Sequence, residues 1–102
     1  MSKKAAYYRT ARPESDMDQQ ISSVRRNIRL TPGETLEEFM DNGVSGNTAD
    51  RPGLAGLLAF CEKNPGMVVF VESADRLARS PTTYAVIEKL LRSAGAEVRV
   101  TR

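Results

Sequence analysis

Apolar and polar residues along this chain follow two alternating periods, one typical of strands and one typical of helices. Residues 4–10 form a short run with strand character. The next segment carries apolar side chains at helical spacing, namely Met17, Ile21, Val24 and Ile28. Asp16 and Asp18 stand at its start, where the helix dipole favours acidic groups. The pattern therefore predicts a strand followed by an amphipathic helix.

The middle of the chain predicts a second strand, a loop and a second helix. We interpret residues 35–41, TLEEFMD, as the strand, although Glu37 and Glu38 also fit a helix. Residues 42–53 contain three glycines and an X-Pro step, which is typical of a loop. Pro52 suits a first helical turn. The helix that follows has one apolar face, formed by Leu54, Leu57, Leu58 and Cys61.

The last third predicts a strand, a helix and a final strand. Residues 67–71, MVVFV, are all apolar, as expected of a strand covered on both faces. Ser80 and Pro81 are typical of a helix start, and Gly95 of its end. Residues 97–101 alternate as a strand. The whole order predicts an α/β fold with a mostly parallel sheet of four or slightly more strands and helices on both faces.

Composition narrows the chemistry that this chain can perform. Its 102 residues suffice for one domain, and a net charge of +2 permits a polyanionic partner without requiring one. The absence of histidine excludes a Ser-His-Asp triad and histidine-ligated metals within the chain. A single cysteine, Cys61, excludes an intrachain disulfide and a cysteine-cluster zinc site. With no long apolar run and no secretory signal, we expect a cytoplasmic protein that makes no use of a membrane.

Polar stretches follow each of the first three predicted strands, at residues 9–15, 41–53 and 72–80. Ligand chemistry in parallel sheets lies beyond the carboxyl ends of the strands. This topology brings four arginines toward one patch, namely Arg9, Arg51, Arg76 and Arg79. Guanidinium groups contact phosphate oxygens two at a time and stay charged, so such a cluster can replace a metal ion in phosphoryl transfer. Strand alternation also places Arg9 and position 11 on one face, with Thr10 on the other.

Each of these residues also has a purely structural interpretation. Arg76 and Arg79 fit a solvated helix face, with Asp75 pairing to Arg79 four residues on. Arg51 fits a helix start, and Arg9 fits a strand edge from which its side chain reaches solvent. The serines lack an adjacent base and fit caps or surface positions, namely Ser15, Ser22, Ser23 and Ser45. The joint placement of the arginines favours the functional interpretation.

Three motifs in this order resemble the catalytic domain of serine recombinases, the family of resolvases, invertases and their larger integrase and transposase relatives. The family opens with Tyr-x-Arg-x-Ser and a glutamine nine residues after the serine, which here correspond to Tyr7, Arg9, Ala11 and Gln20. The second motif corresponds to residues 41–54. The third corresponds to Asp75, Arg76, Leu77 and Arg79. The resemblance covers almost the whole chain.

The resemblance implies a DNA recombinase that uses neither metal nor cofactor. In that mechanism a serine attacks a DNA phosphodiester, forms a 5′-phosphoserine link and frees a 3′-hydroxyl, which later attacks back. The family's roles assign the scissile phosphate to Arg9, Arg76 and Arg79, with Arg51 in support. Asp75 would orient or assist the leaving group. Gln20 would stand behind the phosphate-contacting residues, and the partners would be DNA and further copies in dimers or tetramers.

The chain departs from the family at several positions. Ala11 stands in place of the nucleophile, Ser15 in place of a glutamine, Ser73 near a common lysine and Ala78 in place of a glycine. The chain also ends at Arg102, before the family's long dimerisation helix and DNA-binding domain. We therefore expect residues 1–102 to be a truncated catalytic domain that binds DNA weakly by itself.

Ala11 leaves more than one functional hypothesis. The leading one is a recombinase catalytic domain that is inactive because the nucleophile is absent. The alternative is a non-catalytic regulatory module of the same fold that binds phosphate backbones or a partner recombinase. A small α/β nucleotide binder is weaker, because no glycine-rich strand-to-helix turn of the P-loop or dinucleotide type is present. The alanine fits either deliberate removal of the serine or a natural loss, and the retained arginines favour removal.

Overall fold

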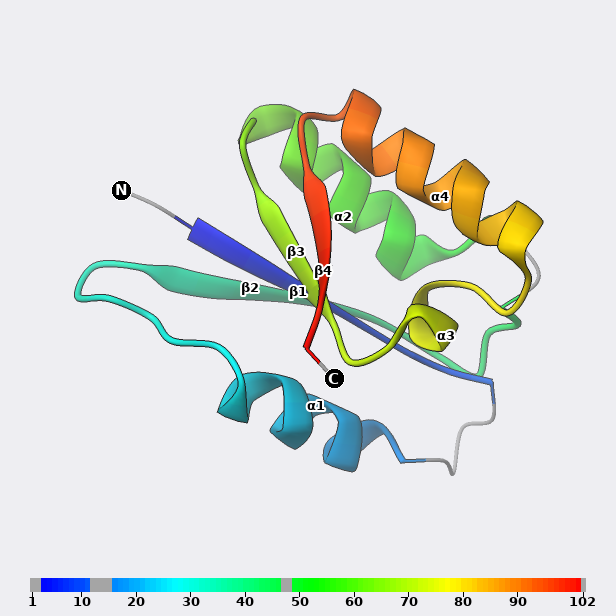
Figure 1. Ribbon diagram of the computed structural model, residues 1–102, viewed down its shortest axis with the longest axis horizontal. Helices are drawn as coiled ribbons and strands as arrows, with labels where there is room; N and C mark the ends of the chain where they lie inside the picture. The colour runs from blue at the N-terminus through cyan, green and yellow to red at the C-terminus, as the bar shows by residue number, and fades with distance from the viewer. Residues whose placement is uncertain (1–2, 12–15, 47–48, 102) are drawn as a thin grey trace.

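Four parallel strands form one sheet that is covered by helices on both sides (Figure 1). The computed structural model describes residues 3–11, 16–46 and 49–101. The strands are β1 (Lys3–Thr10), β2 (Thr35–Asn42), β3 (Val68–Val71) and β4 (Glu97–Val100). The helices are α1 (Met17–Arg26), α2 (Pro52–Lys63), α3 (Ala74–Leu77) and α4 (Pro81–Ser93). The predicted α/β class, with a parallel sheet and helices on both faces, is confirmed.

The sheet order β2-β1-β3-β4 places β1 in the centre. β1 pairs with β2 over eight residues, from Lys3 opposite Thr35 to Thr10 opposite Asn42. This pairing confirms that residues 35–41 belong to a strand. Glu38 is accommodated there because Tyr8 donates to its carboxylate at 2.5 Å, and because Arg25 of α1 contacts both carboxylate oxygens, at 2.6 and 2.8 Å.

Two apolar layers hold the helices on the sheet. Helices α2 and α4 cover one face, and α1 covers the other (Figure 1). The α2/α4 layer includes the buried side chains Leu54, Leu57, Cys61, Ile87 and Leu91. The α1 layer includes Ala6, Tyr8, Met17, Val24 and Phe70. β3 contributes to both layers, with Val69 and Val71 on one side and Phe70 on the other, as its unbroken apolar sequence predicts.

The helix boundaries mostly follow the sequence signals. Pro52 and Pro81 occupy first turns, and Ser80 caps α4 by accepting a hydrogen bond from the Thr83 N–H at 3.1 Å. Gly95 adopts a φ of +84°, the left-handed conformation that ends a helix. α1 ends at Arg26, earlier than its apolar spacing predicts, although Ile28 still packs on the sheet. No helix in the described part of the chain is long and apolar enough to cross a membrane.

The short helix α3 was not predicted, and it overturns one structural interpretation. α3 ends at Leu77, and Ala78 is extended, with φ −156° and ψ 149°. Arg76 and Arg79 therefore do not share a helix face. The main-chain N–H of Arg79 instead donates to the Gly46 carbonyl at 3.0 Å, which ties this segment to the loop after β2.

Candidate active site

The segments that follow β1, β2 and β3 meet at the carboxyl edge of the sheet, where topology predicts a site. Residues from these segments line a cavity of about 610 Å³ that is open to solvent. Its lining residues are Ala11 after β1, Gly43, Ser45 and Gly46 after β2, and Arg79 after α3. Three distant parts of the sequence thus supply one polar cavity.

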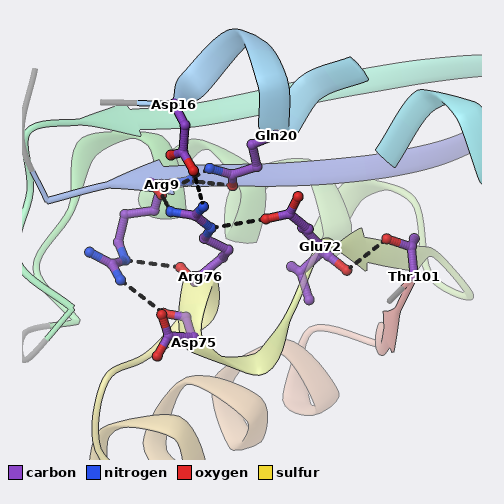
Figure 2. Close-up of polar contacts among 8 residues, drawn as sticks. Arg9, Asp16, Gln20, Glu72, Asp75, Arg76 and Thr101 are labelled. Atoms are coloured by element: carbon purple, nitrogen blue, oxygen red, sulfur yellow. Dashed lines mark hydrogen bonds and ion pairs between the residues drawn. The ribbon is translucent and has the colours of Figure 1, made fainter. Parts of the chain in front are cut away.

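Arg9 fixes the walls of this cavity from behind. Its side chain is buried, with 2% of the residue exposed, so the interpretation as a solvent-reaching edge residue is wrong. Nε donates to the Arg76 carbonyl at 2.9 Å and Nη2 to the Asp75 carbonyl at 2.8 Å (Figure 2). Nη1 donates to the Val44 carbonyl at 2.9 Å. Burial, together with the positive charges of Arg51 and Arg79, lowers the pKa of Arg9.

Gln20 holds the main chain of Arg9 (Figure 2). Its side-chain oxygen accepts from the Arg9 N–H at 3.0 Å, and its side-chain nitrogen donates to the Arg9 carbonyl at 3.1 Å. β3 pairs with β1 only at Ala5 and Ala6. Farther along β1, on the edge that faces away from β2, the Gln20 amide provides the hydrogen bonds that a neighbouring strand would otherwise make. Gln20 is fully buried, and its two bonds join α1 to the end of β1 that carries the site.

Arg51 belongs to a buried network that joins β1, β2 and the start of α2. Its Nη1 donates to the Tyr7 hydroxyl at 3.2 Å, and its Nη2 to the Gly46 carbonyl at 3.4 Å. The Tyr7 hydroxyl donates to Asp41 at 2.7 Å. Asp41 also accepts from the first two free N–H groups of α2, at 2.7 and 3.0 Å, and so caps that helix. Burial and the bond to Asp41 raise the pKa of Tyr7.

Arg76 is bound by two carboxylates that the sequence did not single out as its partners (Figure 2). Nη2 contacts Asp16 at 2.7 Å, and Nε contacts Glu72 at 3.2 Å. Nη1 lies 3.5 Å from the Arg9 carbonyl. Partial burial lowers the pKa of Arg76, but the bonds to Asp16 and Glu72 outweigh this effect and leave that pKa raised.

A family model described as the resolvase N-terminal domain matches residues 4–102. The chain belongs to this family. Its match covers all helices, all strands except the first residue of β1, and every described residue that lines the cavity. Among curated proteins no sequence matches the chain.

Solved structures of serine recombinases share the fold of this resolvase domain. The catalytic domain of ISC1926 TnpA, an IS607-like serine recombinase, is 25% identical with a TM-score of 0.77, over 97% of this chain and 70% of that one. The catalytic domain of TP901-1 integrase is 23% identical with a TM-score of 0.78, over 98% and 77%. A serine recombinase from Sulfolobus solfataricus is 22% identical with a TM-score of 0.76, over 100% and 69%.

In this resolvase domain, Ala11 and Arg79 line the same cavity. Ala11 is exposed at the end of β1, and Arg79 is exposed after α3. Thr10 turns to the other side, where its hydroxyl donates to Asn42 Oδ1 at 2.6 Å, as strand alternation predicts. Asp75 has an exposed side chain and contributes its carbonyl to Arg9.

Gly46 makes the close packing of the resolvase cavity possible. A Cβ atom there would lie 2.2 Å from Cγ of Arg79 and 2.8 Å from Nη2 of Arg9. Any side chain would displace both arginines. The glycine-rich loop therefore lets the backbone at Gly46 pack closely against Arg9 and Arg79, in addition to turning the chain.

Other candidate chemistry is limited in the described part of this resolvase domain. Across residues 3–11, 16–46 and 49–101, no group of three or more His, Cys, Asp or Glu side chains could hold a metal ion. Burial raises the pKa of Cys61 to about 11, as expected of a thiol packed in the α2/α4 layer. Ser15, where the resemblance leads us to expect a glutamine, lies outside the described residues.

Proposed function

We propose that this domain serves strand exchange in site-specific DNA recombination, and that with alanine at position 11 it does not cleave DNA. The observation that carries the proposal is the position of Ala11, exposed in a polar cavity with Arg79. The alanine methyl group lacks a hydroxyl, so it has neither a lone pair for attack nor an acidic proton to transfer. The covalent protein–DNA link of the recombinase mechanism therefore cannot form at this position.

The arginines support a phosphate as the group that the cavity receives. Arg79 is exposed at the cavity, and its planar guanidinium can contact two phosphate oxygens at once. The guanidinium groups of Arg9 and Arg51 lie directly behind the wall formed by Gly46. Fixed donors aimed at a transferring phosphoryl group contribute about 3 kcal/mol each to such a reaction.

We extend the family roles to the remaining residues on the same basis. Of the arginines that the family assigns to the scissile phosphate, Arg79 would contact it directly and Arg76 would do so on exchanging a carboxylate partner. Arg9, whose guanidinium donates to main-chain carbonyls, would act with Arg51 from behind the wall. Asp75, exposed on α3, would assist the leaving 3′-hydroxyl. Gln20 would set the position of Arg9 through the main chain. DNA is the proposed partner, and dimers or tetramers of the full protein are the proposed assemblies.

Restoring the nucleophile tests this proposal. The substrate is a suicide DNA made from the sequences that flank the gene, and the measurement is a covalent protein–DNA adduct on a denaturing gel. We expect no adduct from the unaltered protein and an adduct from Ala11→Ser. Ala11→Ser combined with Arg79→Gln should lose it, because the exposed cation among the described cavity residues is then absent.

Two outcomes would change the assignment. An adduct from the unaltered protein would refute its inactivity, and Ser45→Ala would then show whether the Ser45 hydroxyl, which lines the cavity, had attacked. No adduct from Ala11→Ser, with DNA binding intact, would favour the second candidate, a non-catalytic module that binds phosphate backbones or a partner recombinase. One observation favours that candidate: Arg9 and Arg76 bind protein groups, so Arg79 is the cation among the described residues that line the cavity.

A further inference from the structure

Asp16 stands where two different partners compete for its carboxylate. Asp16 occupies the N-cap position of α1. Its main-chain carbonyl accepts the first helical hydrogen bond, from the Gln20 N–H at 2.9 Å. Aspartate is one of the preferred residues at this position because its side chain satisfies free N–H groups of the first turn. Here the side chain makes no capping bond. It reaches instead to Arg76, sixty positions away in the sequence, at 2.7 Å (Figure 2).

The two carboxylates on Arg76 differ in how firmly they are placed. The Glu72 side chain is 12% exposed, whereas the Asp16 side chain is 41% exposed. Water and salt weaken an exposed ion pair far more than a covered one. Glu72 therefore holds the base of the guanidinium, and Asp16 is the partner that an incoming anion can replace.

We propose that Asp16 is an anion-responsive latch on Arg76, and that a DNA phosphate displaces it. Without DNA, the carboxylate of Asp16 accepts a hydrogen bond from Nη2 of Arg76. When a phosphate binds Arg76, the carboxylate turns to the N-terminus of α1 and caps it. The helix dipole and the free N–H groups favour an anion there, so the displaced group regains part of the lost interaction. This latch rests on the proposed function, since it requires a site that receives DNA phosphate.

The latch predicts that removing the charge of Asp16 tightens DNA binding. The measurement is fluorescence anisotropy of a labelled short DNA duplex at fixed low salt. We expect Asp16→Asn to bind about threefold more tightly than the unaltered protein, the scale of one exposed ion pair. Asparagine caps helices as well as aspartate does, so the fold should be retained. Asp18→Asn is the matched control, because Asp18 lies exposed in the first turn of α1 and its loss removes the same charge.

A second comparison shows whether the increase in DNA affinity caused by Asp16→Asn depends on Arg76. In the Arg76→Gln background, Asp16→Asn should give no more gain than Asp18→Asn. The Nη2–H protons of Arg76, which contact Asp16, should exchange faster with water in Asp16→Asn than in Asp18→Asn when followed by NMR without DNA.

Three results would overturn the latch. The first is equal DNA affinity of the Asp16→Asn and Asp18→Asn proteins, and the second is a gain in DNA affinity from Asp16→Asn that persists in the Arg76→Gln background. The third is the absence of DNA binding by every variant. These measurements do not involve strand cleavage. An Ala11→Ser protein without an adduct would refute catalysis while leaving the latch intact, and an adduct with equal affinities would do the reverse.

Discussion

At the scale of single residues, Gln20 makes the clearest prediction. Gln20→Leu keeps the size of the side chain but leaves the buried N–H and carbonyl of Arg9 without their amide partner. We expect a loss of about 2–6 kcal/mol in the free energy of unfolding, measured by urea denaturation, since each of the two unsatisfied groups costs about 1–3 kcal/mol. Gln19→Leu is the control, because Gln19 is exposed one position earlier on α1. Equal losses in the two variants would show that the amide bonds contribute little.

Single residues also show what the sequence could not predict. Strand topology predicted that the four arginines approach one another, and the structure places the Arg9 guanidinium against the main chain of Arg76. The partners of Arg9 were invisible, because main-chain carbonyls carry no side-chain signature and depend on the course of the backbone. Asp16 had a local interpretation as an acidic helix start, and nothing in its neighbourhood indicated a partner sixty positions away. Glu72 gave a weak signal, since it precedes Arg76 by four residues.

At the scale of elements, two glycines of α2 should respond oppositely to the same change. A Cβ on Gly53 would lie 2.3 Å from the main-chain oxygen of Met40, so Gly53→Ala should destabilise the fold by about 1–3 kcal/mol. A Cβ on Gly56 would meet Phe39 at 3.6 Å, an ordinary contact. Gly56→Ala should stabilise by about 0.5–1 kcal/mol, because alanine favours the helix. Thermal unfolding of both variants measures this, and a shift of the same sign would contradict it.

The elements differ in how far sequence alone defines them. α2 and α4 carry proline at the start, glycine or asparagine near the end and a continuous apolar face, so their bounds were predictable. β2 was ambiguous because Glu37 and Glu38 fit a helix, and only pairing along β1 decides between the two. α3 has four residues, too few for a periodic pattern, and its position depends on bonds to Arg9 and Gly46.

At the scale of the whole molecule, the absence of histidine predicts a flat dependence of stability on pH near neutrality. Histidine is the side chain whose ordinary pKa lies between pH 5 and 8, and this chain has none. We expect the free energy of unfolding to change little between about pH 5.5 and 8. Urea denaturation across this range measures it, and a steep change there would contradict the expectation.

The acid limit of this plateau should come from carboxylates that the fold keeps ionised. The Thr31 N–H and the Lys4 ammonium lower the pKa of Glu34 from 4.5 to about 2, and Arg25 lowers the pKa of Glu38. A pKa that is lower in the folded state means that unfolding takes up protons. The stabilisation is complete above about pH 4.5 and is lost as the pH falls toward 2. Glu34→Gln should therefore flatten the acid limb without moving the alkaline one.

The alkaline limit has the opposite sign because the groups concerned are buried in their neutral forms. Burial raises the pKa of Cys61 from 9.0 to about 11, so the folded state holds this proton more tightly than the unfolded one. That stabilisation is complete below pH 9.0 and is lost as the pH rises toward 11. Cys61→Ala removes a titrating group from the α2/α4 layer and should reduce the slope above pH 9, after a uniform loss from the smaller side chain is subtracted. An unchanged slope would assign the alkaline limb to Tyr7 and Tyr8, whose pKa values burial also raises.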